Sequence, residues 1–451
     1  MGPTPRWLVV LILGGLSWVP VSPAHGNPES PEIQPVERLT QFGITWTFDK
    51  KYPAGQYANG DYWVVGPVKI ISISPPSVDE DGRIRNGSQW NPVLAEDQGY
   101  DSAKGDMKYN PAKNAGRPDG KDLSAENPLV LSTGSLVSTI SRQELQPRPQ
   151  LKTAAILTVV SSAPEPGSFR PPPVGTDKTS HWNKRNLDYS LLKSLPPVAG
   201  TPSLDSVERY FEKPWLEQNT SWTACYIHPL DNQACYGKNI AIQAAEGLLS
   251  LHLDYPRERK ETLYIRLVQY GIDIYGSAKA GAVWIGYGGH NQGRKMPLIL
   301  AGLALNNAEI LEYGDAAKHL IFQEDQQTWY VTREDVGRPL NTRDNRPHEP
   351  YREEDIGLPE WGVQHLQRPM DDGRNWNAYY RNICLSSELG HALAAHLTPG
   401  AVPLWNWPAF FDYMDRGFLT DQADKGGKSN PIPAFVANMW NTYRTDPASR
   451  R

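Results

Sequence analysis

Cysteine is scarce in this chain of 451 residues, which contains only three. No C-x-x-C pair and no zinc-type spacing of cysteine and histidine occurs, so a zinc site is not expected. Beyond the N-terminus, no apolar segment approaches the roughly 20 residues that a membrane-spanning helix needs. Basic residues are not in excess either, because the chain has 45 basic and 50 acidic residues. This balance argues against a nucleic-acid partner.

Aromatic residues, glycine and proline are abundant by contrast. The chain has 15 Trp and 21 Tyr, which is enough aromatic surface to fill a large core and to exclude a disordered chain. The 38 Gly and 40 Pro follow no period, which excludes a fibrous repeat. The composition therefore predicts a globular protein, and its length predicts two or three domains.

Residues 1–26 have the parts of a secretory signal peptide. Arg6 supplies the positive charge, residues 8–16 (LVVLILGGL) form a short apolar run, and Ala24-His25-Gly26 places small residues before the expected cleavage at Asn27. The alternative is a membrane anchor, but the apolar run is far shorter than a bilayer requires. We therefore expect an exported protein, secreted or periplasmic, without a membrane span after cleavage.

The rest of the chain divides into three regions with different patterns. From 41 to 163, alternating β-branched and aromatic runs such as 44–48 (ITWTF) predict a β-sandwich-like domain. Proline clusters mark 164–200 as a linker. From 201 to 445, apolar residues recur at helical spacing and predict paired helices. The expected fold is α+β and multidomain, with a β-sandwich-like domain followed by a complete or partial α/α-hairpin toroid.

A glycine-rich loop, 287–295 (YGGHNQGRK), is the first candidate site. Glycines let the backbone approach a ligand closely, and His290 can transfer a proton near neutral pH. Arg294 and Lys295, at the start of a predicted helix, favour an anion such as a carboxylate. The alternative is a connector whose histidine caps a helix and whose cations are solvated.

A second candidate is the segment 376–382 (WNAYYRN). Aromatic rings stack on the faces of sugars, and polar neighbours bind their hydroxyls. Arg381 beside Tyr380 favours a lowered pKa of that phenol and a role in proton transfer. The alternative is the start of a helix whose tyrosines pack in the core.

The cysteines frame a third candidate. In an oxidising compartment Cys225 and Cys235 could close a small loop. Tyr226 and His228 inside it, together with Tyr236, could form one aromatic wall of a cleft. The alternative is a structural loop held by a disulfide. The remaining Cys384 lies in a helical stretch and is expected to be a buried apolar residue rather than a nucleophile.

A fourth candidate combines Glu360 and Trp361 with Asp371 and Asp372. Paired carboxylates are what a glycosidase requires. The alternative is that these acids are solvated charges in a long loop.

Three motifs of the second half are similar to those of one enzyme class: 270–276 (YGIDIYG), 288–297 (GGHNQGRKMP), and 390–395 (GHALAA) followed by Trp405-Asn406. Over roughly residues 200–445 the chain resembles exported bacterial polysaccharide lyases with a helical toroid, of the alginate-lyase and heparinase-like type. Toroid alginate lyases carry an Asn-Asn-His run, whereas His290 here follows two glycines and precedes Asn291.

Such lyases cleave uronic-acid glycans by β-elimination. A cationic or polar group neutralises the C5 carboxylate, a Tyr or His takes the C5 proton, and a Tyr or water returns a proton to the leaving oxygen. The resemblance implies His290 as base or carboxylate partner, Asn291 and Arg294 as neutralising groups, and Tyr379 or Tyr380 as the second proton-transfer group. Further substrate contacts are expected from Lys295, Trp376, Arg381, Tyr226, His228, Glu360 and Trp361.

The sequence therefore predicts an exported polysaccharide lyase that acts on uronic-acid-containing glycans without a cofactor or metal. One alternative is a glycoside hydrolase on a similar helical scaffold, with Glu360 and Asp371 or Asp372 as its carboxylates. Another is a non-catalytic glycan-binding surface protein. A lyase needs His290, Arg294 and a tyrosine in one cleft, whereas a hydrolase needs two carboxylates roughly 5–10 Å apart.

Overall fold

The structure is a computed structural model that describes residues 2, 33–103, 107–144, 148–286, 288–337, 350–361, 379–423 and 430–445, with the backbone alone for 379–382 and 421–423. Contacts join the chain from Ile33 onward into one compact unit. The predicted signal peptide lies outside the described residues except for Gly2. Among the helices that are described, none is long and apolar enough to cross a membrane.

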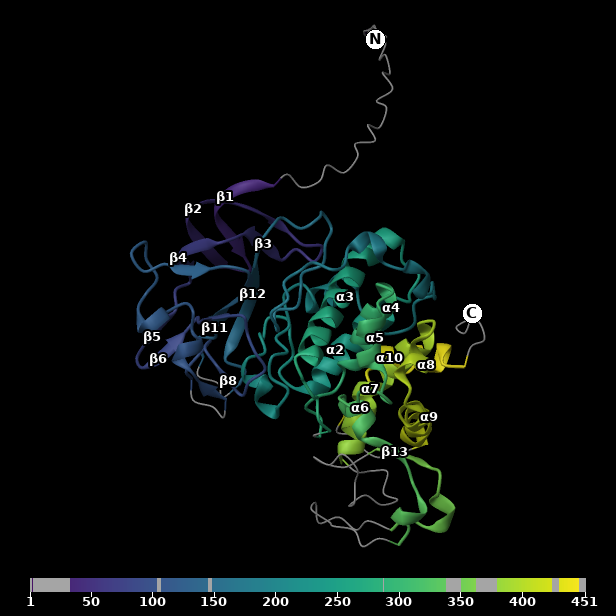
Figure 1. Ribbon diagram of the computed structural model, residues 1–451. Coiled ribbons are helices and arrows are strands. Elements are labelled where there is room, and N and C mark those ends of the chain that lie inside the picture. The colour runs from purple at the N-terminus through teal and green to yellow at the C-terminus, as the bar shows by residue number, and fades with distance from the viewer. Residues whose placement is uncertain are drawn as a thin grey trace. The chain divides into compact units, whose positions relative to one another are not determined.

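Eight strands of the N-terminal part form one curled mixed sheet (Figure 1). Seven of them follow the order β10-β4-β2-β3-β12-β11-β7, and β1 pairs with β2 beside this path. Within this sheet β3 and β12 pair in parallel, with Leu157 opposite Tyr62, and the other neighbours are antiparallel. The strands are β1 (Gln34–Gln41), β2 (Ile44–Gln56), β3 (Tyr62–Val65), β4 (Val68–Ser74), β7 (Ser88–Trp90), β10 (Leu129–Leu131), β11 (Gly134–Ser141) and β12 (Leu151–Val160).

Among the described residues, three two-stranded ladders lie outside this sheet. They pair β5 (Val78–Glu80) with β6 (Arg83–Arg85), β8 (Asp97–Gln98) with β9 (Lys108–Tyr109), and β13 (Thr328–Tyr330) with β14 (Pro359–Trp361).

Strand β12 is buried on both faces, and its sequence explains why. Ala155, Leu157 and Val159 point into the core of the sheet. The alternate residues Ala154 and Ile156 pack on the other face, against a cluster formed with Leu216, Tyr226 and Ile227. A strand covered on both faces needs a nearly continuous apolar run, which residues 154–160 (AAILTVV) supply.

The prediction of a β-sandwich-like domain is therefore wrong in the number of sheet layers. The strands do lie in the N-terminal part, but they form a single curled sheet rather than two packed sheets. Residues of the 216–227 segment cover the second face of β12. In a sandwich, a second sheet would cover that face.

The second half is helical (Figure 1). Its helices are α1 (Leu204–Tyr210), α2 (Gly237–Ser250), α3 (Arg257–Lys279), α4 (Lys295–Ala304), α5 (Ala308–Gly314), α6 (Gln323–Gln326), α7 (Tyr379–Leu397), α8 (Ala401–Trp405), α9 (Pro408–Ala423) and α10 (Ala434–Tyr443). Short 3-10 turns cover Pro111–Lys113, Pro118–Gly120, Lys184–Asn186, Tyr189–Leu191, Trp222–Tyr226, Arg333–Asp335 and Glu353–Asp355.

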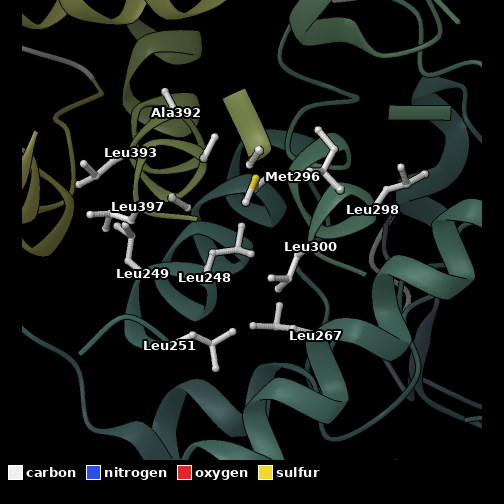
Figure 2. Close-up of a cluster of buried hydrophobic side chains, with 14 of the residues drawn as sticks. Leu248, Leu249, Leu251, Leu267, Met296, Leu298, Leu300, Ala392, Leu393 and Leu397 are labelled. Atoms are coloured by element: carbon white, nitrogen blue, oxygen red, sulfur yellow. The ribbon is translucent and has the colours of Figure 1, made fainter. Parts of the chain in front are cut away.

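A leucine-rich core holds the central helices together (Figure 2). It contains Leu248 and Leu249 of α2, Leu267 of α3, Met296 and Leu300 of α4, and Leu393 and Leu397 of α7. Each of these large side chains is almost fully buried, and burying one contributes about 1.5–3 kcal/mol. Two close helix approaches depend on glycine, because a Cβ at Gly271 of α3 would lie 2.2 Å from the Pro297 carbonyl oxygen of α4, and one at Gly390 of α7 would lie 2.6 Å from Ala245 of α2.

The predicted α/α toroid is contradicted. The helices described here do not close into a ring of hairpins. Consecutive hairpins would pair α2 with α3, but α2 packs mainly on α7, which is more than 120 residues away in sequence, and α3 packs mainly on α4. Helix lengths also range from 4 to 23 residues, whereas a toroid repeats hairpins of similar length.

The proline-rich segment 164–200 contributes to the core. Phe169, Leu187, Leu191 and Leu195 belong to the helical core cluster. Its Arg170 is buried between two carboxylates, with Nε 2.6 Å from Asp61 Oδ2 and Nη2 2.5 Å from Asp273 Oδ2. Asp61 precedes β3 and Asp273 lies on α3, so this arginine joins the sheet to the helices.

Candidate functional site

The glycine-rich loop is wedged between α2 and α7 and leads into α4. A Cβ at Gly237, the first residue of α2, would lie 1.9 Å from the His290 carbonyl oxygen. The Lys238 amide donates to the Gly289 carbonyl oxygen at 2.8 Å. On the other side, a Cβ at Gly289 would lie 3.0 Å from Ile383 of α7. Glycine at 237 and 289 therefore lets the loop pass between the two helices.

Arg294 and Lys295 are buried and neutralised inside the protein. Arg294 forms an ion pair with Glu217 at 3.3 Å and donates to the Gln292 carbonyl oxygen at 2.7 Å. Lys295 lies 2.6 Å from Asp325 and donates to the Trp405 carbonyl oxygen at 3.0 Å. Because each cation already has a carboxylate partner, the structure does not bring them to a surface where they could meet a substrate carboxylate.

Other predicted contact residues are also internal. Asn291 donates to the Ile285 carbonyl oxygen at 2.9 Å, and Tyr226 packs under β12. Glu360 lies on β14, and its Oε1 atom is 3.0 Å from Nη1 of Arg416. Trp361 belongs to the helical core.

His228 lies in the buried network around Arg294. Its Nδ1 is 3.0 Å from the Cys235 carbonyl oxygen. Burial lowers the pKa of His228 to about 4, the charge of Glu217 opposes that shift, and the charge of Arg294 adds to it. His228 is therefore a neutral internal residue near pH 7, without the exposure that a substrate contact requires.

The second predicted segment is only partly described. Tyr379, Tyr380 and Arg381 open α7, one turn before Ile383, which meets the glycine-rich loop. The remaining predicted positions lie outside the described residues: Trp376, Asp371 and Asp372.

The loop closed by the disulfide packs against the sheet. Cys225 and Cys235 are bonded, and the loop they close lies against the outer face of β12 through Tyr226 and Ile227. Cys384 is unpaired and buried, and burial raises the pKa of its thiol, with the negative charge of Glu388 adding to that effect.

His290, Tyr236 and Lys238 form the partly exposed part of this region. The rings of His290 and Tyr236 meet edge to face, with centroids 4.9 Å apart. Lys238 is half-buried at the start of α2, and its Nζ donates to Asn430 Oδ1 at 2.6 Å. Burial lowers the pKa of Lys238, and no described carboxylate forms an ion pair with it. The imidazole and the phenol are thus in contact before the first turn of α2, and the backbone amide of Lys238 in that turn binds the same loop.

A pair of buried acids, Glu324 of α6 and Glu388 of α7, lies near Gly293 at the end of the loop. Neither carboxylate has an ion-pair partner among the described residues, and both oxygens of Glu388 lack a hydrogen-bond partner there. The amide of Gly293 donates to Glu324 at 2.9 Å. Burial raises the pKa of Glu388 well above its usual range, and the charge of Glu324 adds to it.

These two acids make stability depend on pH. Burial raises the pKa of Glu324 to about 7, whereas the unfolded chain releases this proton near 4.5. The native state therefore holds an extra proton between these values, and stability falls as the pH rises through them. We expect Glu324→Gln to be nearly neutral at pH 5 and stabilising by up to about 3 kcal/mol at pH 8.

Urea unfolding at both pH values checks this expectation. Glu126→Gln, an exposed loop position, serves as control and should change neither value. Equal effects of Glu324→Gln at pH 5 and pH 8 would contradict the assignment of a buried proton.

In the described part of the chain, no group of three or more His, Cys, Asp or Glu side chains is arranged to hold a metal ion.

Sequence reasoning missed Lys238, Glu324 and Glu388. One signal for Glu388 was available: Cys384, Glu388 and His391 recur at helical spacing on one face of α7, so an acid lies on the apolar side. Lys238 has no comparable signal, because it becomes notable only through the fold of the loop onto α2.

Comparison with protein-family models, with curated proteins and with solved structures returned no match to this chain.

Proposed function

We propose that this protein cleaves a uronic-acid-containing glycan by β-elimination at the start of α2. The observation that carries the proposal is the edge-to-face contact of His290 and Tyr236, in the loop whose Gly289 carbonyl oxygen accepts from the backbone amide of Lys238. An imidazole and a phenol in contact can move two protons in one reaction, and a half-buried cation can bind a carboxylate.

The proposed reaction is an elimination with two proton transfers. The His290 imidazole takes the proton from C5 of the uronate, and the electron pair forms the C4–C5 double bond. The bond from C4 to the glycosidic oxygen breaks, and the Tyr236 phenol returns a proton to that oxygen. Lys238 neutralises the uronate carboxylate, which makes the C5 proton more acidic.

Lys238 takes the role that the sequence assigned to Arg294. The ion pair of Arg294 with Glu217 is internal, whereas Lys238 is partly exposed and forms no ion pair with a described carboxylate. The predicted roles of Tyr379 and Tyr380 remain predictions, and both residues open the helix that borders the same loop.

The hydrolase alternative is less well supported. Glu360, one of its two carboxylates, is fully buried and paired with Arg416. The interior pair Glu324 and Glu388 is fully buried as well, and an acid must reach the glycosidic oxygen to protonate it.

The test is an assay of the purified protein on a panel of uronic-acid and neutral glycans. We expect the ultraviolet absorbance of an unsaturated uronate only with acidic glycans. Lys238→Met should lower kcat/KM about 100-fold, because one charged donor to the developing anion is lost, and Lys238→Arg should restore part of the rate. Lys213→Met removes another half-buried lysine, which is paired with Asp231, and should leave the rate unchanged. New reducing ends without the absorbance would show hydrolysis and exclude the proposal.

A further inference from the structure

Two cavities share residues of the segment 176–182 in their lining. One has a volume of about 610 Å³ and reaches the end of β12. The other has a volume of about 710 Å³ and reaches the C-terminal ends of α3 and α4. Both are of the size that holds small molecules and oligosaccharides. His181, Trp182 and Asn186 line both cavities, so the two are parts of one groove.

Aromatic side chains stand at the centre of this groove. Trp182 is half-buried, and its ring meets Tyr275 edge to face with centroids 6.0 Å apart. His181 is exposed and contacts the same indole at 5.6 Å. The indole therefore has a fixed orientation between the two cavities, as a stacking surface for an apolar ring face requires.

The charged side chains of the groove have partners within its walls. Asp177 pairs with His181 at 2.8 Å, Glu309 with Lys279 at 2.6 Å, and Glu165 with Arg185 at 2.7 Å. The Lys178 ammonium donates to the carbonyl oxygens of Pro172 and Pro173 at 2.7 and 3.0 Å. These pairings leave little net field for an ion, so charge does not select the ligand.

Uncharged polar groups complete the lining. Thr176, Thr179 and Asn186 are exposed and line both cavities. Hydroxyl and amide groups around an aromatic ring match a ligand with apolar ring faces and many hydroxyls. We propose that this groove binds a neutral oligosaccharide, with a sugar ring stacked on Trp182.

The groove is separate from the proposed cleavage site. The His290 loop enters α4 at its N-terminus, whereas Leu305 and Asn307 of the groove follow its C-terminus. Ten residues of helix separate the two ends, about 15 Å at 1.5 Å per residue. The groove proposal therefore does not depend on the proposed β-elimination.

Calorimetric titration of the full chain with cello-, manno-, xylo- and chitohexaose tests the proposal. We expect at least one of these neutral probes to bind. Trp182→Ala should weaken that binding at least about tenfold, because the stacking surface is removed. Trp222→Ala, at another half-buried indole outside the groove, should retain it.

A second variant does not depend on removing a packed side chain. Ala280 is exposed and lines the larger cavity, so Ala280→Trp should fill the cavity and weaken binding at least about tenfold while the fold persists. Lack of binding by all four probes would overturn the proposal. Unchanged affinity in both groove variants, or binding of uronate-containing chains alone, would overturn it as well.

Discussion

Replacing Arg170 with methionine is expected to destabilise the protein by about 3–5 kcal/mol, because it leaves two buried carboxylates without their cation. The side chains of Arg170, Asp61 and Asp273 are 1%, 2% and 6% exposed. Burial raises the pKa of Asp273 to about 6, and the charge of Arg170 opposes that shift. Without the arginine, both acids must take up protons or remain charged in the interior.

Equilibrium unfolding in urea measures this loss. Arg185→Met is the matched control, since it breaks an ion pair with Glu165 in which both side chains are 67% exposed, and it should leave the free energy of unfolding nearly unchanged. A triple variant, Arg170→Met with Asp61→Leu and Asp273→Leu, should recover much of the stability because no charge remains buried. A small effect of Arg170→Met alone would contradict the role assigned to this residue.

Replacing His290 with alanine is expected to lower kcat about 10²–10⁴-fold, the range lost with a general base. The imidazole is the group that takes the C5 proton in the proposed reaction, so chemistry should suffer more than binding. KM should change little, since Lys238 and not His290 holds the carboxylate. The residual activity of the variant should also lose the rise of the rate with pH that deprotonation of the base causes in the wild-type protein.

His319→Ala is the matched control for this variant. Its ring stacks on Tyr313 with centroids 4.5 Å apart, and both residues are half-buried, like His290 and Tyr236. It should keep full activity and the wild-type pH profile. Equal loss of kcat in both variants, or full activity of His290→Ala on an acidic glycan, would exclude His290 as the base.

Local pattern predicted the helices well where their apolar residues recur regularly. The stretch from 201 to 445, where apolar residues recur at helical spacing, does hold the helices from α1 to α10. The way the helices pair was not predictable, because it depends on distant close approaches. Gly271 and Gly390, which belong to the motifs behind the resemblance to lyases, serve such approaches in this fold.

The sequence could predict which residues the candidate site contains, but it could not predict which of their side chains are exposed. The glycine-rich loop does gather chemically active residues, and His290 and Tyr236 do meet there. The sequence could not show that Arg294 and Lys295 have internal partners, because Glu217 and Asp325 lie 77 and 30 residues away along the chain. Nor could it show the groove at Trp182, whose walls come from β12, α3 and α5.

The position of β12 has a consequence for synthesis on the ribosome. This strand lies between β3 and β11 and is the last of the sheet to be translated. Until it emerges, β3 has an open edge, and roughly 90 residues must form a closed loop before the parallel pairing can begin. The nascent chain therefore carries an unpaired, apolar strand edge for most of the translation of the sheet. Chaperone binding or ribosome-associated aggregation should be greatest for chains arrested just before residue 151 and should fall once β12 has left the exit tunnel.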